Sequence, residues 1–135
     1  MRPGTRRPRA EELMRVAERV MAWERAPAGS RVEITLLPAA AMRRANHRAT
    51  GRRGLTDVLA YTLPQPDGRL LGDVYICPAA AANAARNGAG MTEELVRLAV
   101  HGTLHVLGYD HPEDARRTRS RMWQLQERYV KRLLR

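Results

Sequence analysis

The sequence predicts a single small α+β domain, with helices packed on a mixed β-sheet and a metal site at the end of a helix. Segments of helical and strand-like apolar spacing follow one another in the order helix–strand–helix–strand–strand–helices. The length of 135 residues suits one domain, and no internal repeat divides it. Three of the four histidines fall within residues 101–111, at the end of one predicted helix.

Helices are predicted where apolar residues recur every three or four positions, as Val16 and Val20 do in the first one. Thr92 is expected to cap a later helix that Gly108 ends, and Pro112 is expected to begin the last helix. The predicted helices span residues 10–25, 38–45, 78–86, 92–107 and 112 to the C-terminus.

Strands are predicted where apolar and polar residues alternate, as around Val32 and Ile34. The turn residues of segment 64–68 (PQPDG) separate two further strands, which indicates a hairpin. A basic loop, residues 48–55 (RATGRRGL), precedes that hairpin. The predicted strands span residues 31–37, 56–63 and 70–77.

Charge and cysteine content indicate the compartment and the class of partner. The net charge of +10 favours a polyanionic partner such as nucleic acid, although a genome that enriches arginine is the alternative explanation. Cys77 is the only cysteine, which fits a reducing compartment. Residues 1–8 (MRPGTRRP) are expected to be a flexible basic arm before one domain at 9–135. Because no signal peptide or membrane-spanning run is recognised, we expect a cytoplasmic protein without a membrane partner.

The segment from His101 to His111, HGTLHVLGYDH, predicts a metal site. Positions i and i+4 share one helix face, so His101 and His105 can present two imidazoles to one ion. Gly108 allows a sharp turn that returns His111 to the same ion. Three protein ligands leave a fourth tetrahedral position open, as in catalytic zinc sites, although copper, nickel and iron also accept imidazoles. The alternative is that these histidines are ordinary core and surface residues.

The residue after the first histidine restricts the chemistry. Zinc peptidases with similar histidine spacing carry a glutamate there as general base, whereas this chain has Gly102. Because glycine cannot accept a proton from water, the sequence disfavours peptide hydrolysis by that mechanism.

With these motifs, the sequence resembles the YbeY family of bacterial rRNA-maturation endoribonucleases. His101 to His111 matches the family's H-G-x-L-H-x-x-G-Y-D-H signature, while TDVL at 56–59 and LGDVYI at 71–76 resemble two further segments. The resemblance implies an α+β fold, one zinc ion on the three histidines and cleavage of single-stranded RNA. It also implies roles in 16S rRNA 3′-end maturation and ribosome quality control, with ribosomal RNA and the small ribosomal subunit as partners.

The sequence departs from the family at the arginine that the family uses in catalysis, because that position is Thr50. Arg48, Arg52 and Arg53 lie in the same predicted loop and are candidates to contact a phosphate. We therefore predict catalytic roles for Arg48 and Arg52, together with His111, with solvated loop charges as the alternative. Nearby arginines neutralise the charge that develops on phosphorus during cleavage.

The final predicted helix is strongly basic, either as a solvated face or as a surface that follows RNA phosphates. Asp110 is expected to orient a ligand or to form a turn, and Cys77 to be a small buried hydrophobe. The basic residues are Arg116, Arg117, Arg119, Arg121, Arg128, Lys131, Arg132 and Arg135.

Three other functions stay open from the sequence. The first is a zinc hydrolase of another substrate, such as a peptide. The second is a non-catalytic ribosome-assembly factor with a structural zinc, and the third is a basic binding module without metal. The sequence leaves the oligomeric state undetermined.

Overall fold

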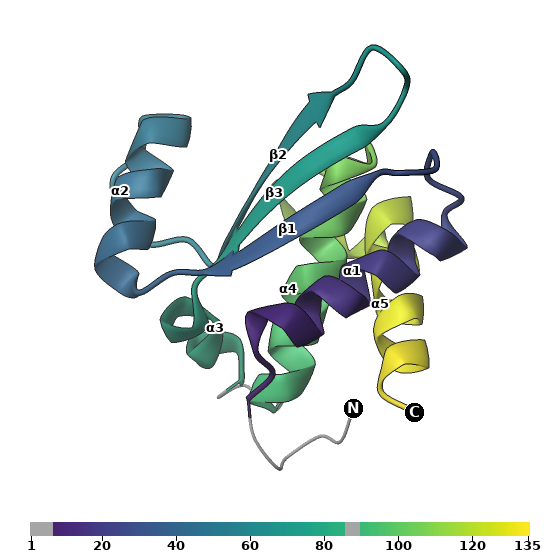
Figure 1. Cartoon of the computed structure of the whole chain (residues 1–135). Coiled ribbons are helices and arrows are strands. Elements are labelled where there is room, and N and C mark those ends of the chain that lie inside the picture. Colours follow the sequence, from purple (N-terminus) through teal and green to yellow (C-terminus); the bar gives the residue numbers. More distant parts are fainter. Residues whose placement is uncertain (1–6, 86–89) are drawn as a thin grey trace.

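The computed structural model describes residues 7–85 and 90–135, and its small mixed sheet with surrounding helices confirms the predicted α+β class. Figure 1 shows α1, α4 and α5 together on one side of the sheet, and α2 beyond the end of the strands. The elements are α1 (Ala10–Trp23), β1 (Arg31–Leu36), α2 (Ala39–Thr50), β2 (Val58–Pro64), β3 (Leu70–Ile76), α3 (Pro78–Ala85), α4 (Met91–Val106), the 3-10 helix η1 (Ala115–Arg119) and α5 (Arg121–Leu133).

The sheet has the strand order β1-β3-β2, and its mixed character confirms the prediction. β3 pairs in parallel with β1 and antiparallel with β2, as expected for a hairpin between β2 and β3. Gln65 donates its backbone N–H to the carbonyl of Arg69 at 2.8 Å, and Gly68 supplies a φ of 94° in the turn. Only glycine adopts this φ without strain, which explains why the segment signals a turn so clearly.

Two glycines set the close approach of α4 to β3. A Cβ atom built on Gly102 of α4 would lie 2.6 Å from a methyl of Val74, and one on Gly72 of β3 would lie 2.6 Å from a methyl of Val106. Since both valines are buried, each glycine makes room for a rigid β-branched side chain from the opposite element. This reciprocal packing fixes α4, and with it the histidines it carries, on the sheet.

The hydrophobic core lies between one face of the sheet and helices α1, α4 and α5. Along β3, alternate residues such as Val74 and Ile76 are fully buried, while the residues between them point to the other face. Cys77 is also fully buried as a free thiol, as expected. The opposite sheet face, here called the outer face, carries Tyr61 and Leu63, which are 41% and 62% exposed.

The boundaries of the helices around α4 and α5 differ from the prediction. The last helix begins at Arg121 rather than Pro112, because Ser120 caps it by accepting the backbone N–H of Trp123. The short helix η1 precedes it, capped by Asp114. α4 begins at Met91 with Gly90 as its N-cap, so the predicted cap Thr92 lies inside the first turn and is buried.

The second helix is longer than predicted. It runs to Thr50 and ends where Gly51, with a φ of 73°, donates its N–H to the carbonyl of His47. No proline or glycine interrupts the residues before Gly51, so the helix continues through them. Arg48 consequently lies on α2, not in a loop. Most of the predicted basic arm, residues 1–6, lies outside the described residues.

Candidate metal centre

The structure brings the three predicted metal-binding histidines together at the end of α4. Their possible ligand atoms all lie within 4.8 Å of one another. The ring centroids are 4.6 Å apart for His101 and His105, and 5.0 and 5.1 Å from these to His111. One helical turn separates the first two residues, so the i, i+4 spacing places both rings on one face as predicted.

The chain returns His111 to the cluster through a Schellman motif at the end of α4. Gly108, with a φ of 100°, donates its N–H to the carbonyl of His105, and Tyr109 donates its N–H to the carbonyl of Leu104. Asp110 then accepts the backbone N–H of His111 at 2.8 Å, so its carboxylate contacts the backbone of a predicted metal ligand. The Gly-Tyr-Asp sequence therefore provides the geometry that closes the site.

A carboxylate just after the end of α1 secures this turn, although it lies far away in the sequence. Glu24 accepts hydrogen bonds from the hydroxyls of Tyr109, at 2.6 Å, and of Tyr129 on α5. Burial and the neighbouring carboxylate raise the pKa of Tyr129 to about 12, so its hydroxyl stays protonated as a donor. The turn after α4 is thus tied to both α1 and α5.

The hydrogen bonds at the Nδ1 atoms decide which ring nitrogens can bind a metal. His101 Nδ1 lies 2.7 Å from the Gln126 amide oxygen, His105 Nδ1 lies 3.0 Å from the carbonyl of Tyr109, and His111 Nδ1 lies 2.9 Å from that of Pro112. All three partners are acceptors, so each Nδ1 carries the proton and each Nε2 keeps a lone pair. Nε2 of His101 and Nε2 of His105 lie only 3.1 Å apart. Two lone pairs this close are stabilised by a cation between them, so the donor set fits a metal ion.

The environment keeps the imidazoles in the neutral form that metals bind. Burial lowers the pKa of His101 to about 4, with a smaller opposing effect from its hydrogen bond to Gln126. Burial also lowers the pKa of His105, and the neighbouring His111 lowers it further. A divalent cation therefore does not compete with a proton at His101 near neutral pH.

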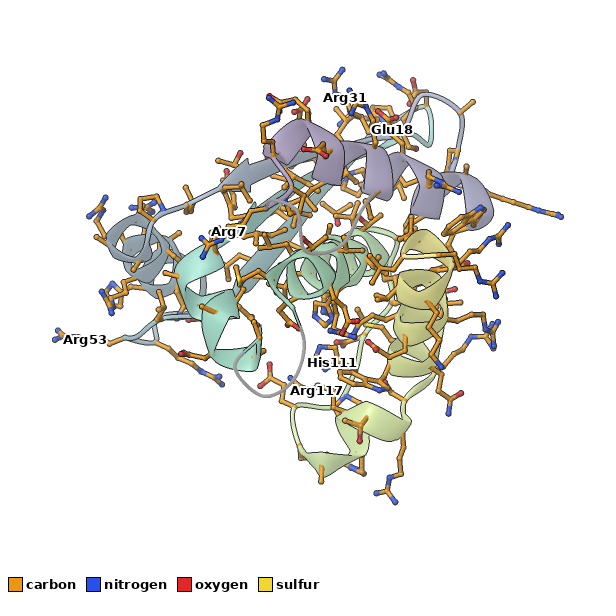
Figure 2. The ribbon with its side chains drawn as sticks, turned by 90° about the horizontal axis from the view of Figure 1, so that it is seen from below. Arg7, Glu18, Arg31, Arg53, His111 and Arg117 are labelled. Carbon is orange, nitrogen blue, oxygen red and sulfur yellow. The ribbon has the colours of Figure 1, made fainter. Side chains whose placement is uncertain are left out.

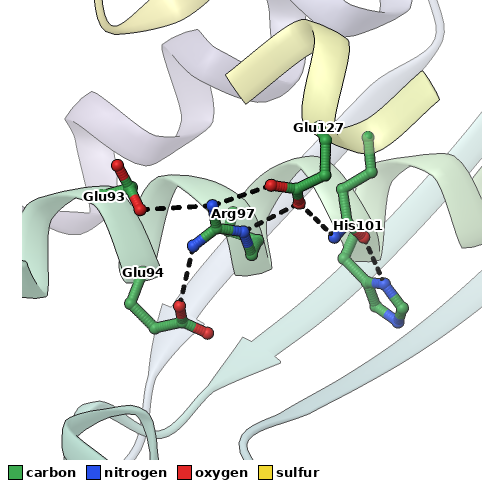
Figure 3. A network of polar contacts seen from close by, with 6 residues as sticks. Glu93, Glu94, Arg97, His101 and Glu127 are labelled. Carbon is green, nitrogen blue, oxygen red and sulfur yellow. Dashed lines mark hydrogen bonds and ion pairs between the residues drawn. The ribbon is translucent and has the colours of Figure 1, made fainter. Parts of the chain in front are cut away.

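A partly buried polar network holds His101 from the side away from the cluster (Figure 3). Gln126, 2% exposed, accepts from His101 and donates its amide N–H to Glu127 at 3.0 Å. Glu127 in turn accepts two hydrogen bonds of 2.8 Å from Arg97, which also donates to Glu94 at 3.0 Å. Although burial raises the pKa of Glu127, the Arg97 hydrogen bonds hold it below its ordinary value. The network fixes the acceptor that orients the His101 ring.

Sequence reasoning missed Gln126, although the sequence contains a signal for it. Met122, Gln126 and Tyr129 follow helical spacing along the buried face of α5, and Gln126 is the polar residue in that apolar stripe. A buried amide has to satisfy both its donor and its acceptor, so its presence there indicates a specific partner. The identity of that partner, His101, depends on the packing of α5 against α4 and has no local signature.

A pocket of about 380 Å³ adjoins the histidine cluster and combines His101 with charged side chains. Asp57 and Arg117 both line it, beside Trp123. Burial raises the pKa of Asp57, while Arg117 opposes that rise. The sequence predicted Arg117 only as one of many basic residues on the final helix. In the structure it lies on the same side of the molecule as His111 (Figure 2). Glu94, Glu127 and Arg97 also line this pocket and pair with one another, so an anionic substrate would meet Arg117 beside carboxylates.

The three arginines that the sequence placed in one loop lie in different surroundings. Arg52 reaches toward the histidine segment, with its Nη1 3.9 Å from the carboxylate of Glu113, but its side chain is 76% exposed. Arg48 lines a separate groove beside the outer face of the sheet. Figure 2 shows Arg53 pointing away from the body of the molecule, well apart from His111. The catalytic roles predicted for Arg48 and Arg52 stay predictions.

Gly102, the residue after the first histidine, faces the sheet and not the histidine cluster. Its Cβ direction points at Val74, and the position is fully enclosed in the core. A glutamate there would meet β3 before it reached a water molecule on a metal. Because of this backbone direction, no side chain at position 102 can act as the general base that zinc peptidases carry there.

The fold and the histidine cluster define a small α+β protein with three histidines that could hold a metal ion, an arrangement that hydrolases use. Comparison with known proteins is more specific: the family model described as "Endoribonuclease YbeY" matches residues 5–134. The chain belongs to this family of RNA-cleaving hydrolases, as the sequence resemblance implied.

Individual relatives agree with the family match. The Endoribonuclease YbeY of Micrococcus luteus is 36% identical over 133 residues, which cover 92% of this chain and 83% of that protein. The protein of the same name from Mycobacterium ulcerans is 36% identical over 114 residues, covering 76% of this chain and 64%, less than two thirds, of its own length. The solution structure of TM1509 from Thermotoga maritima aligns with a TM-score of 0.60 and 25% identity, covering 92% of this chain and 83% of that one.

None of the helices within residues 7–85 and 90–135 combines the length and the apolar character that crossing a membrane requires.

Proposed function

We propose that this protein is a zinc-dependent endoribonuclease that cleaves single-stranded RNA at the site formed by His101, His105 and His111. One zinc ion per chain is held by the three Nε2 atoms. The observation that carries the proposal is the set of three acceptors at the Nδ1 atoms, which leaves the three Nε2 lone pairs free in rings whose possible ligand atoms lie within 4.8 Å of one another. Neutral imidazoles are borderline ligands that suit zinc.

The bound zinc would lower the pKa of a coordinated water and polarise a phosphoryl oxygen. The protein's own residues supply the rest. Gln126 orients the ring of His101, and the turn at Gly108 orients that of His111. Arg117, which lines the adjoining pocket, neutralises charge on the scissile phosphate, and Arg52 reaches the same side from the segment before β2. The cluster among the described residues contains three side chains, which leaves a vertex for chemistry.

Family membership and charge support a proposal for the biological role. With a net charge of +10, the chain favours RNA over neutral or cationic substrates. We propose that it acts in the cytoplasm on ribosomal RNA of the small subunit, in maturation of the 16S rRNA 3′ end and in ribosome quality control. Peptide hydrolysis is disfavoured, because Gly102 faces Val74 and offers no general base.

The test combines metal content with RNA cleavage. We expect wild-type protein to contain about one zinc per chain and to cut single-stranded RNA faster than duplex RNA. His105→Ala should lose most of the zinc and the cleavage together. His47→Ala is the matched control, because His47 is exposed on α2 and lies outside the cluster; it should retain both.

Two outcomes would contradict the proposal. Wild-type protein that holds zinc but does not cut RNA would indicate a structural metal and a non-catalytic role. Equal cleavage by wild type and His105→Ala would show that the histidine site does not cut the RNA.

A further inference from the structure

A groove of about 480 Å³ lies beside the outer face of the sheet, where α2 approaches strands β2 and β3. The α2 residues that line it repeat at helical spacing, so one face of the helix forms one wall. Tyr61 of β2 and Tyr75 of β3 form the other wall. The α2 wall consists of Ala41, Arg44, Ala45, Arg48 and Ala49.

The two tyrosines form an aromatic platform on the sheet. Their ring centroids are 5.9 Å apart and the rings cross at 75°, an edge-to-face pair. In such a pair the ring that presents its edge keeps both of its faces free of its partner. Tyr61 is 41% exposed, although an aromatic side chain this size is usually more buried. Exposed rings on a sheet surface are what single-stranded RNA bases stack on.

Charge is distributed unevenly around this platform. Arg44 and Arg48 are exposed, and neither forms an ion pair with any acidic side chain in the described part of the chain. On the other side of Tyr61, toward β1, the neighbouring strand positions are the acidic residues Asp73 and Glu33. A polyanionic strand on the platform is therefore attracted toward α2 and repelled from β1.

We propose that this groove binds single-stranded RNA, with a base stacked on the Tyr61–Tyr75 pair and phosphates on Arg44 and Arg48. The proposal rests on the function proposed above for its substrate class. It defines a contact separate from the histidine site: Gly72 and Val74 of β3 face α4, whereas Tyr75, and Tyr61 paired with Asp73, alternate with them onto the opposite face of the sheet.

The segment between α2 and β2 connects the two sites along the surface. Arg48 lines the groove, and Arg52, four residues later, lies 3.9 Å from Glu113, two residues after His111. Asn46 anchors this segment by donating its side-chain amide to the carbonyl of Gly54. One RNA strand can thus follow a line of arginines from the groove to the histidine site.

The test measures binding without cleavage, using a short fluorescein-labelled oligouridine and fluorescence anisotropy in the presence of EDTA. Tyr61→Ala should weaken binding about tenfold, from the stacking energy of one base, whereas Tyr61→Phe should stay within about twofold. Leu63→Ala is the matched control, since Leu63 is exposed on the same strand and the same face but does not line the groove.

The arginines are tested by salt dependence. Each phosphate contact on a single strand contributes about 0.7 to the slope of log K against log salt, so combined Arg44→Gln and Arg48→Gln should lower the slope by about 1.4. Arg43→Gln is the control, because Arg43 is exposed on the same helix but lies outside the groove.

Binding by Tyr61→Ala equal to that of wild type, or no binding by wild type, would overturn the inference. So would sedimentation that shows a wild-type dimer and a monomeric Tyr61→Ala variant, since a second copy would then occupy the groove. Zinc-loaded wild type is assayed for cleavage in parallel. Absent cleavage with intact groove binding would reject the proposed activity alone, and cleavage with unchanged binding by Tyr61→Ala would reject the groove alone.

Discussion

The histidine site and the arginine segment before β2 differ in how the fold holds them. Each imidazole has a defined Nδ1 partner, and the partner of His101 is itself fixed by a partly buried chain of hydrogen bonds. The arginines at 48–55 are exposed, and the pair between Arg52 and Glu113 is long at 3.9 Å and solvated on both sides. Metal ligation requires a fixed geometry, whereas a mobile guanidinium can still neutralise phosphate. The comparison indicates that the fold fixes side-chain positions more firmly at the histidine site than at the arginines before β2.

Arg117 gives the largest expected effect and the sharpest test of this comparison. It lines the pocket beside His101 and lies with its guanidinium carbon 5.8 Å from the centre of the Trp123 ring. We expect Arg117→Gln to lower kcat for RNA about 100-fold with unchanged zinc content, because a charge near the reacting phosphate is lost. Arg52→Gln should lower kcat less, and Arg48→Gln should raise KM with little change in kcat. Single-turnover cleavage of a short RNA measures all three.

A different order of effects on kcat among these three variants would contradict the contrast between the two regions. If Arg48→Gln lowered kcat as much as Arg117→Gln, the catalytic role predicted for Arg48 would hold and the groove would not be a separate contact. Arg119→Gln serves as control, because Arg119 is exposed on the same short helix but does not line the pocket.

The second prediction concerns the hydrogen bond that orients His101. Gln126→Leu keeps the volume but removes the acceptor, so the ring loses its partner at Nδ1. We expect zinc affinity to fall about 10–100-fold, the range found for outer-sphere partners of metal-bound histidines. Competition with a chromogenic chelator measures that affinity without any RNA.

A purely structural role for Gln126 would give another pattern. In that case Gln126→Leu would lower the free energy of unfolding while folded protein bound zinc as tightly as wild type. Gln124→Leu makes the same chemical change at an exposed position of α5 and should alter neither property. Gln126→Glu retains an acceptor for His101 and should recover part of the affinity.

The sequence predicted those parts of the site that depend on local spacing. His101 and His105 follow from the helical repeat, and the return of His111 follows from Gly108, whose positive φ the turn requires. The mixed sheet follows from the order of periodic segments and from the turn at 64–68. These features can be predicted from the sequence because residues close together along the chain determine them.

The partners that complete the site lie far away along the chain and have no local signature. Gln126 is 25 residues from His101, and the Tyr109 hydroxyl finds Glu24 across 85 residues. Both pairings arise from the way α1, α4 and α5 pack. The start of the last helix was predicted wrongly for a related reason, since Ser120 competes with Pro112 as a start signal and its capping hydrogen bond decides the boundary.

The smallest expected effect concerns the packing that carries the metal site, and it tests whether the rigidity of α4 comes from its contact with the sheet. In an open helix, Gly→Ala stabilises by up to about 1 kcal/mol. At Gly102 the added methyl would lie 2.6 Å from Val74, whose side chain is fully buried and cannot rotate away. We therefore expect Gly102→Ala to lower the free energy of unfolding by about 1–2 kcal/mol, as overpacking does.

Urea unfolding of Gly102→Ala, Val74→Ala and the double variant measures the coupling between these two residues. The double variant should be more stable than the sum of the two single effects, because removing the valine methyls makes room for the new one. Additive effects would show that α4 tolerates a shift from β3, and the contrast between a fixed histidine site and an exposed arginine segment would then need a source other than this packing.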